Sequence, residues 1–203
     1  MTDLTITNYA ELKAFLALAS MRSDLTTVLG VFINAAHARI AAKGLIMATL
    51  SLNASSVALP ADFGRLHNLY VVSDPAVLAT GVSADQLTQL QAASADLPQW
   101  FNVSGLNLGL GPSPDQTYEG RLVYRVSATK FAADGDTNAI LQAYPMLYVH
   151  AAQAEIARFI FDSDAEGSRE ALFAAELEAI NQAELAKALD GLALQLSPSS
   201  SVV

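Results

Sequence analysis

The stretch TNAILQAYPMLYVHAAQAEIARFIF, residues Thr137–Phe161, decides the fold of this chain. Its Tyr144-Pro145 pair predicts the start of a helix, because the fixed φ of proline suits the first helical position and its missing N–H is not needed there. Apolar residues then recur at helical spacing along one face: Tyr148, Val149, Ala152, Ile156, Phe159 and Ile160. The opposite face is also poor in charge, so we expect this helix to be packed on two sides. That face carries Leu147, Ala151, Ala154 and Phe161.

Two amphipathic helices are predicted near the N-terminus. Asn8 can cap the first helix, with Glu11 three residues later in the manner of a capping box, and the helix is expected to end within residues 20–23. Asp24 or Thr26 is the expected cap of the second helix, and Gly44 is its expected end. The apolar face of this second helix consists of Leu29, Phe32, Ile33, Ala36 and Ile40.

A long helix rich in Ala and Glu is predicted over residues 168–189, after a polar loop at residues 162–167. One narrow face carries Leu172, Ala175, Ala179, Ala183 and Ala186, and a second carries Phe173, Leu177 and Ile180. The acids of this helix, Glu170, Glu176, Glu178 and Glu184, are most simply a solvated face. The alternative is that, in a ring of subunits, they help to line an acidic lumen.

Between these helices the apolar period changes from 3.6 to 2, which predicts strands. Residues 46–59 suggest a hairpin, residues 66–72 a further strand, and residues 100–110 a second hairpin that turns at Ser104-Gly105. Residues 118–127 alternate again. The chain is therefore predicted to be an α+β protein: a helical bundle of two N-terminal and two long C-terminal helices, with a small, mostly antiparallel β-sheet inserted between them.

The expected organisation is one domain over residues 1–190 followed by a C-terminal tail at residues 191–203. Within the domain, residues 1–44 form a helical hairpin, residues 45–131 the β region, and residues 137–190 the later helices. The tail LALQLSPSSSVV combines a short apolar stretch with a serine run, which cannot offset the entropy of ordering without a partner.

Composition excludes several classes of function. The chain has 203 residues, a net charge of −9 and no cysteine, so disulfides and thiolate metal sites are absent. The negative charge argues against a surface that binds the phosphates of nucleic acids, although DNA can still slide past such a surface. No apolar run reaches membrane length and the N-terminus lacks a basic leader pattern, so we expect a soluble protein made in a cytoplasm.

No catalytic, cofactor or metal site is predicted. His37, His67 and His150 fall on three separate elements without the spacing of a metal site or a triad. The acids of DSDAEG at residues 162–167 copy the start of a calcium loop, but Phe173 stands where its last ligand would be, so a helix entry is favoured. Gly105, Gly109 and Gly111 lie in a hairpin and no helix opens after them, which argues against a phosphate cradle. Arg121, Arg125 and Lys130 form a modest basic cluster that is more often surface charge than a binding site.

The order of several short motifs resembles a known family. Two helices, NYAELKAFL and TTVLGVFINAAHARI, are followed by VALPADF, then by W-F-x-V and L-x-L-G-L-G-P-S-P-D, a Y-R-V strand and the helix YPMLYVHAAQAEIA. Together, over roughly residues 7–185, they resemble the head-to-tail adaptor (connector) proteins of tailed bacteriophages. The second helix ends with fewer basic residues than the family pattern, and the serine-rich tail is not part of that pattern.

The resemblance implies a structural virion protein without enzymatic activity or cofactor. It implies a ring of identical subunits, usually twelvefold, that binds the portal protein in the neck of the virion and extends the DNA channel. It also implies a platform for a tail, nozzle or stopper protein, at the head–tail interface of a virion assembled in the host bacterial cytoplasm. C-terminal segments of the family dock on the portal, and here Leu192, Leu194 and Leu196 are the expected portal-docking residues.

Two features of the residues themselves suit these expectations. Like charge lets the DNA backbone slide, and helices that are apolar on two faces suit lateral packing around a symmetry axis. The rival interpretation is a soluble ligand-binding or hydrolytic domain with a pocket in the β region near Tyr70, Trp100 and Tyr124.

Overall fold

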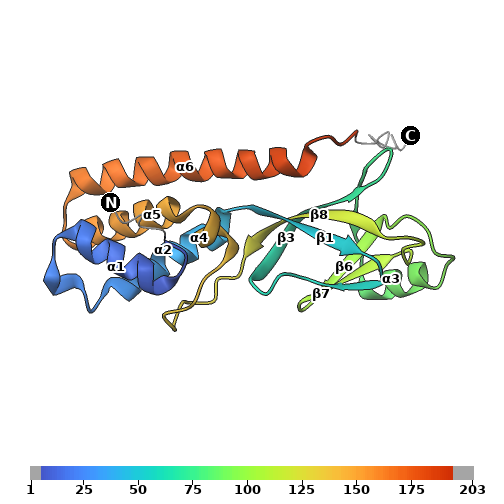
Figure 1. Ribbon diagram of the computed structural model, residues 1–203, viewed down its shortest axis with the longest axis horizontal. Helices are drawn as coiled ribbons and strands as arrows, with labels where there is room; N and C mark the ends of the chain where they lie inside the picture. Colours follow the sequence, from blue (N-terminus) through green and yellow to red (C-terminus); the bar gives the residue numbers. More distant parts are fainter. Residues whose placement is uncertain (1–5, 194–203) are drawn as a thin grey trace. The chain divides into compact units, whose positions relative to one another are not determined.

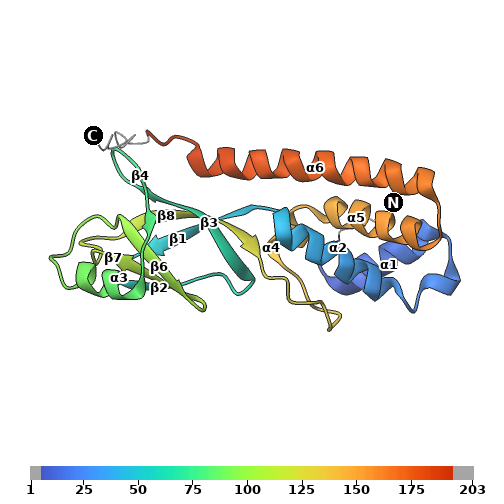
Figure 2. The same ribbon diagram turned by 180° about the vertical axis from the view of Figure 1, so that it is seen from behind.

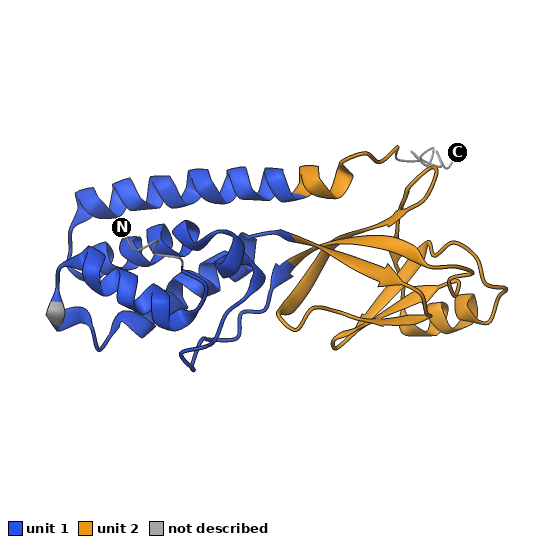
Figure 3. Ribbon diagram, in the orientation of Figure 1, with its two compact units in different colours: residues 1–46, 125–184 blue, residues 47–124, 185–203 orange. Residues whose placement is uncertain are grey.

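The computed structural model describes residues 6–193 and confirms an α+β fold, with six α-helices and two four-stranded sheets in that range. The chain divides into two compact units (Figure 3): residues 1–46 and 125–184 form the first, and residues 47–124 and 185–203 the second. The first unit is helical and the second contains most of both sheets. None of the helices in the described range has the length and apolarity needed to cross a membrane.

The helical unit contains α1, α2, α4, α5 and most of α6. Their bounds are Tyr9–Ser20 for α1, Leu29–Lys43 for α2, Ala139–Ala143 for α4, Pro145–Phe159 for α5 and Ser163–Leu189 for α6. A 3-10 turn, Ser23–Leu25, joins α1 to α2. Figures 1 and 2 show α5 between α6 on one side and α1 and α2 on the other.

The start of α5 is the one that the sequence predicts, with Pro145 at the first helical position after Tyr144. The two-sided packing is also confirmed over most of its length, because both faces are buried. The buried residues are Leu147, Tyr148, Val149, Ala151, Ala152, Ala154, Ile156 and Ala157. Packing ends before the helix does: Phe159 and Phe161 are exposed.

The caps of the first two helices differ in their agreement with the sequence. The Asn8 side chain accepts a hydrogen bond from the Glu11 N–H over 3.0 Å, so the predicted cap of α1 is confirmed. Helix α2 starts later than predicted, at Leu29, and Val28 precedes it without a side-chain cap. Asp24 does not cap α2 because it lies in the 3-10 turn, five residues before the helix starts, where it forms an ion pair with Arg22. The predicted apolar face of α2 is buried throughout.

Helix α6 begins five residues before the predicted start, at Ser163 rather than at residue 168. The Asp162 carboxylate accepts a hydrogen bond from the Ala165 N–H over 3.0 Å, which caps the helix at that point, so the predicted polar loop at residues 162–167 is wrong. The acids of DSDAEG therefore belong to a helix entry, as favoured. Phe173, Leu177 and Ile180 are buried, whereas the face with Leu172 is exposed.

The acids of α6 are not a simple solvated face. Glu184 is 1% exposed and accepts a hydrogen bond from the Tyr144 hydroxyl. Glu170 pairs with Arg39 of α2, whose guanidinium also lies 4.6 Å from the centre of the Phe173 ring. Of the four predicted surface acids, only Glu178 is exposed. Packing against α2 and α5 overrides the polarity of this helix face.

A buried hydrogen-bonded network joins α2, α5 and the segment that follows the last strand. His37 is 1% exposed; its Nε2 lies 3.1 Å from the Thr129 carbonyl and its Nδ1 lies 2.9 Å from the Tyr148 hydroxyl. A carbonyl only accepts, so Nε2 carries the hydrogen and Nδ1 accepts from Tyr148. The Asn138 side-chain amide donates to the same hydroxyl over 2.8 Å. These roles of the two ring nitrogens are those of the neutral histidine, which the lowered pKa of His37 favours.

The second unit contains two sheets and one helix. The first sheet has the order β1-β8-β3-β4 and the second the order β2-β7-β6-β5. The strands of the first sheet are β1 (Ile46–Leu52), β8 (Tyr118–Val126), β3 (Phe63–Val72) and β4 (Val77–Leu78). Those of the second are β2 (Ser56–Ala58), β7 (Asn107–Gly111), β6 (Trp100–Ser104) and β5 (Thr80–Gly81), and α3 spans Ala84–Gln91.

The predicted hairpin at residues 46–59 is wrong, because β1 and β2 belong to different sheets. The predicted hairpin at residues 100–110 is confirmed: β6 and β7 pair in antiparallel register, with Trp100 opposite Gly111, around a turn in which Gly105 has a φ of +59°. A methyl group on Gly109 would lie 2.6 Å from Leu87 Cδ2 of α3. Glycine is therefore used here for close packing of a helix on the sheet.

The network around His37 predicts a dependence of stability on pH. Burial lowers the pKa of His37 below its usual value, more than the Thr129 carbonyl raises it. The unfolded chain, with an ordinary histidine pKa of about 6.5, therefore binds more protons at low pH. The contribution of neutral His37 to the free energy of unfolding is therefore complete above about pH 6.5. It is lost as the pH falls from there toward the lowered pKa of the folded state.

We expect the free energy of unfolding in urea to fall between pH 7.5 and pH 5, and to fall less in a His37→Gln variant. Replacing the exposed His67 with Gln serves as the control and leaves the dependence unchanged. Tyr148→Phe leaves two buried polar partners unsatisfied and is expected to cost about 1–3 kcal/mol at pH 7.5. An equal pH dependence in wild type and His37→Gln would contradict this account.

Candidate functional site

The beginning of the C-terminal tail is held in the second unit. Gly191 has a φ of +69°, as is common after a helix, and the Leu192 N–H donates to the Leu189 carbonyl over 3.0 Å. The Ala76 N–H, just before β4, then donates to the Ala193 carbonyl over 2.9 Å. Of the expected portal-docking residues, Leu192 is half-buried, and Leu194 and Leu196 lie outside the described residues.

Arg121 of β8 fixes where the tail leaves the helix. Its Nη1 donates to the carbonyls of Ala188 over 3.3 Å and Asp190 over 2.6 Å. These carbonyls lie beyond the last intrahelical N–H, and a positive charge at a helix C-terminus is favourable. The sequence suggested only surface charge for Arg121. Its role depends on β8 lying beside the end of α6, which no local pattern reveals.

The residues of the rival pocket are divided between the two sheets. Tyr70 and Tyr124 belong to the first sheet and are buried, whereas Trp100 belongs to the second sheet. The Tyr124 hydroxyl donates to Asp62 over 2.9 Å, and the Tyr70 hydroxyl accepts from Asn68 over 2.7 Å. Both hydroxyls are therefore used in the internal hydrogen bonding of the unit.

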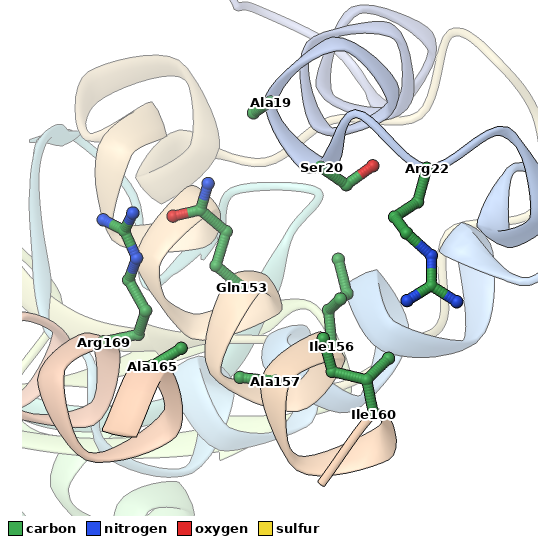
Figure 4. Close-up of a pocket in the computed structure, with 9 residues that line it drawn as sticks. All are labelled: Ala19, Ser20, Arg22, Gln153, Ile156, Ala157, Ile160, Ala165 and Arg169. Carbon is green, nitrogen blue, oxygen red and sulfur yellow. The ribbon is translucent and has the colours of Figure 1, made fainter. Parts of the chain in front are cut away.

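A pocket in the helical unit lies among the end of α1, the second half of α5 and the start of α6 (Figure 4). Ile156, Ala157 and Ile160 of α5 form an apolar floor, and Ala19 and Ala165 add small walls. Figure 4 shows the Gln153 side chain between Arg169 on one side and Ser20 and Arg22 on the other. The pocket thus combines an aliphatic floor with two guanidinium groups.

Several polar groups at this pocket and beside it have unmet hydrogen-bonding capacity. Gln153 Oε1 and His150 Nδ1 are buried atoms without a partner. Within the described part of the chain, Arg169 has no ion pair or hydrogen bond; its charge acts on His150. Arg22 is engaged with Asp24 through two hydrogen bonds. An acceptor and a free guanidinium in one concave site suit a peptide segment, which supplies both an N–H and an oxygen.

A half-buried His–Glu pair lies next to the pocket along α5 and α6. His150 Nε2 and Glu176 Oε2 are 3.7 Å apart, too far for a hydrogen bond. Burial, and then the positive charge of Arg169, lower the pKa of His150, while burial raises the pKa of Glu176. Both shifts favour the neutral forms, so this pair contributes little as an ion pair.

The histidines stay apart, as the sequence predicts: His37 is in the buried network, His67 is on the surface of β3, and His150 is beside the pocket. Over residues 6–193, no three His, Asp or Glu side chains come together in a way that could hold a metal ion. The sequence analysis missed the pocket and Arg169. Neither has a local sequence signal, because the pocket brings the end of α1 together with α5 and α6, which lie far from it in the sequence.

The described residues thus show two surface features: a tail whose first residues are hydrogen-bonded within the second unit, and an apolar, arginine-lined pocket on the helical unit. Comparison with known proteins identifies the family. The sequence model described as SU10 adaptor protein matches residues 7–195, and the chain belongs to this family of phage head–tail adaptors. The resemblance in motif order is thereby confirmed. No curated protein matches the chain significantly.

Membership makes the chain a structural adaptor of a bacteriophage virion, with portal and tail proteins as the partners that the family implies. A structural family of this kind suggests a protein without enzymatic activity.

The role of Arg121 as a positioning residue for the tail can be tested by amide hydrogen exchange. Arg121→Met keeps the apolar stem but removes the donors to Ala188 and Asp190. We expect faster exchange at Leu192 and Ala76, with a loss of global stability of about 1 kcal/mol. The matched control is Arg125→Met on the same strand, which is expected to leave exchange at these amides unchanged. Equal protection in both variants would show that Arg121 does not hold the tail.

Proposed function

We propose that this adaptor forms a ring of twelve copies below the portal, where it connects the DNA-filled head to the tail and extends the DNA channel. The observation that carries the proposal is the family match, which spans nearly the whole chain. The ring also serves as the attachment platform for a tail, nozzle or stopper protein.

The charge of the chain supports a channel role. A net charge of −9 per copy, repeated around a ring, repels the DNA backbone and so opposes sticking during passage. The acids that face a lumen are not those of the buried side of α6, because Glu170, Glu176 and Glu184 are at least partly buried within the helical unit. Of that set, Glu178 is the member that is exposed on the single chain.

The tail supports portal docking. Leu192, Leu194 and Leu196 alternate with Ala193 and Gln195 in the sequence, a spacing that places alternate side chains on one side when a segment binds in an extended conformation. Arg121 and the Ala76 N–H hold the chain up to Ala193, which limits the entropy lost when the following residues bind. We propose that the three leucines are the portal-docking residues.

The test is native mass spectrometry of the purified chain mixed with the portal ring of the same virion. We expect twelve copies to add per portal ring, and a variant lacking residues 192–203 to add none. A triple variant with Ser at positions 192, 194 and 196 is expected to lose binding as well. The matched control, with Ala at positions 199, 200 and 201, is expected to bind as wild type does. A chain that stays monomeric and ignores the portal would refute the proposed function.

A further inference from the structure

Two large apolar residues stand where the fold would be better served by glycine. Met21 ends α1 with a φ of 52°, and Phe161 follows α5 with a φ of 59°. Left-handed backbone is unfavourable for residues with a Cβ, and helix ends in this conformation usually carry glycine. Met21 is 93% exposed and Phe161 is 95% exposed, so neither side chain compensates by burial within the chain.

Both residues are next in the chain to residues that line the pocket. Met21 lies between Ser20 and Arg22, and Phe161 follows Ile160, and these three neighbours line the pocket. Three more apolar residues are exposed near the end of α1, the start of α2 and the end of α5: Leu18, Val31 and Phe159. Phe159 joins this surface to α2 through its ring contact with Phe32, at 5.3 Å between centroids. We call the pocket and these five exposed residues the helical-end surface.

The pocket also has polar groups without partners in the described chain. Gln153 Oε1 is buried without a donor, and Arg169 has no ion pair in the described chain. An exposed apolar surface around a site with unmet polar groups is typical of a protein-binding surface.

A second copy of the chain offers a complementary face. The exposed side of α6 carries Leu172, Ala175 and Ala179, and its small side chains leave room for large ones. Glu178 is exposed on the same helix and can meet the guanidinium of Arg169.

We infer that the helical-end surface, with Phe161 and Met21 as its apolar contacts and Arg169 as its charged contact, binds the exposed face of α6 of a neighbouring copy. The contact joins different surfaces of the two copies, which is the type that closes a ring. The inference rests on the proposed ring, and it names the residues that hold neighbouring copies together.

The first test separates contacts between copies from contacts with the portal. Wild type is titrated onto portal rings below saturation, and native mass spectrometry counts the copies per ring. If neighbouring copies attract one another, most portal rings carry either no copies or a full set. If copies bind independently, the number of copies per portal ring follows a binomial distribution. We expect the double variant Phe161→Gly with Met21→Gly to give the binomial distribution instead of mostly empty and full rings. Its affinity for each site on a partly filled portal ring is expected to be at least tenfold lower.

The glycine variants also exclude a folding defect as the cause. Because glycine suits both backbone conformations, the isolated variant is expected to keep its Tm or gain roughly 2–4 °C per substitution. Arg169→Glu is expected to weaken assembly in the same way, and Arg65→Glu on the exposed surface of β3 is the control for charge.

The second test locates the contact on the partner copy. The chain has no cysteine, so a variant with Phe161→Cys and Ala175→Cys carries only these two thiols. Within one chain they are separated by about 18 Å of helix α6, far beyond the reach of a disulfide. Oxidation of rings on the portal is expected to give a ladder of covalent multimers. Phe161→Cys with Arg65→Cys is the control and is expected to give none.

The outcomes distinguish the two proposals. If wild type does not add to the portal, the ring itself fails. If the glycine variant fills rings as wild type does, the helical-end surface is not a subunit contact and the inference is wrong while the ring stands. A uniform loss of occupancy without a change of pattern would assign this surface to the portal, and rings without covalent multimers would exclude the α6 face as its partner.

Discussion

The burial of both faces of α5 is the constraint on which the helical unit depends. A helix without a polar face needs neighbours on two sides, and α1 and α2 cover one side while α6 covers the other. Ion pairs link α5 to the helices that cover it. Arg39 of α2 pairs with Glu155 of α5 and with Glu170 of α6. Arg158 of α5 pairs with Glu166 of α6. The acids of α6 serve this packing more than they serve solvation.

Packing within the helical unit leaves some large apolar side chains exposed. Where α5 ends, Phe161 is almost fully exposed and Phe159 is only partly covered by Phe32, and Met21 at the end of α1 is also exposed. These helix ends keep left-handed backbone that glycine would adopt more easily. Strain and exposure in the same two residues are consistent with a binding surface, because neither benefits the isolated chain.

The sequence predicted elements well where the signal was local and failed where it depended on distant partners. Pro145, the Asn8 cap and the hairpin of residues 100–110 depend on the preferences of single residues or short turns, and all three are confirmed. The pairing of β1 and β2 was wrong because strand pairing is decided across the sheet, not along the chain. Asp24 was predicted to cap α2, but it lies in a 3-10 turn before the helix and pairs with Arg22.

By itself, the sequence determined the α+β class, the central helix with two apolar faces, the absence of catalytic spacing among the histidines and, through the order of its motifs, the adaptor family. Only the tertiary structure decided that Arg121 caps the end of α6, that Glu184 is buried, that Phe161 and Met21 are exposed, and that Arg169 lines a pocket. The physical reason is that periodicity specifies which residues share a face of one element. It does not specify which other element covers that face, and burial, pairing and exposure follow from that second choice.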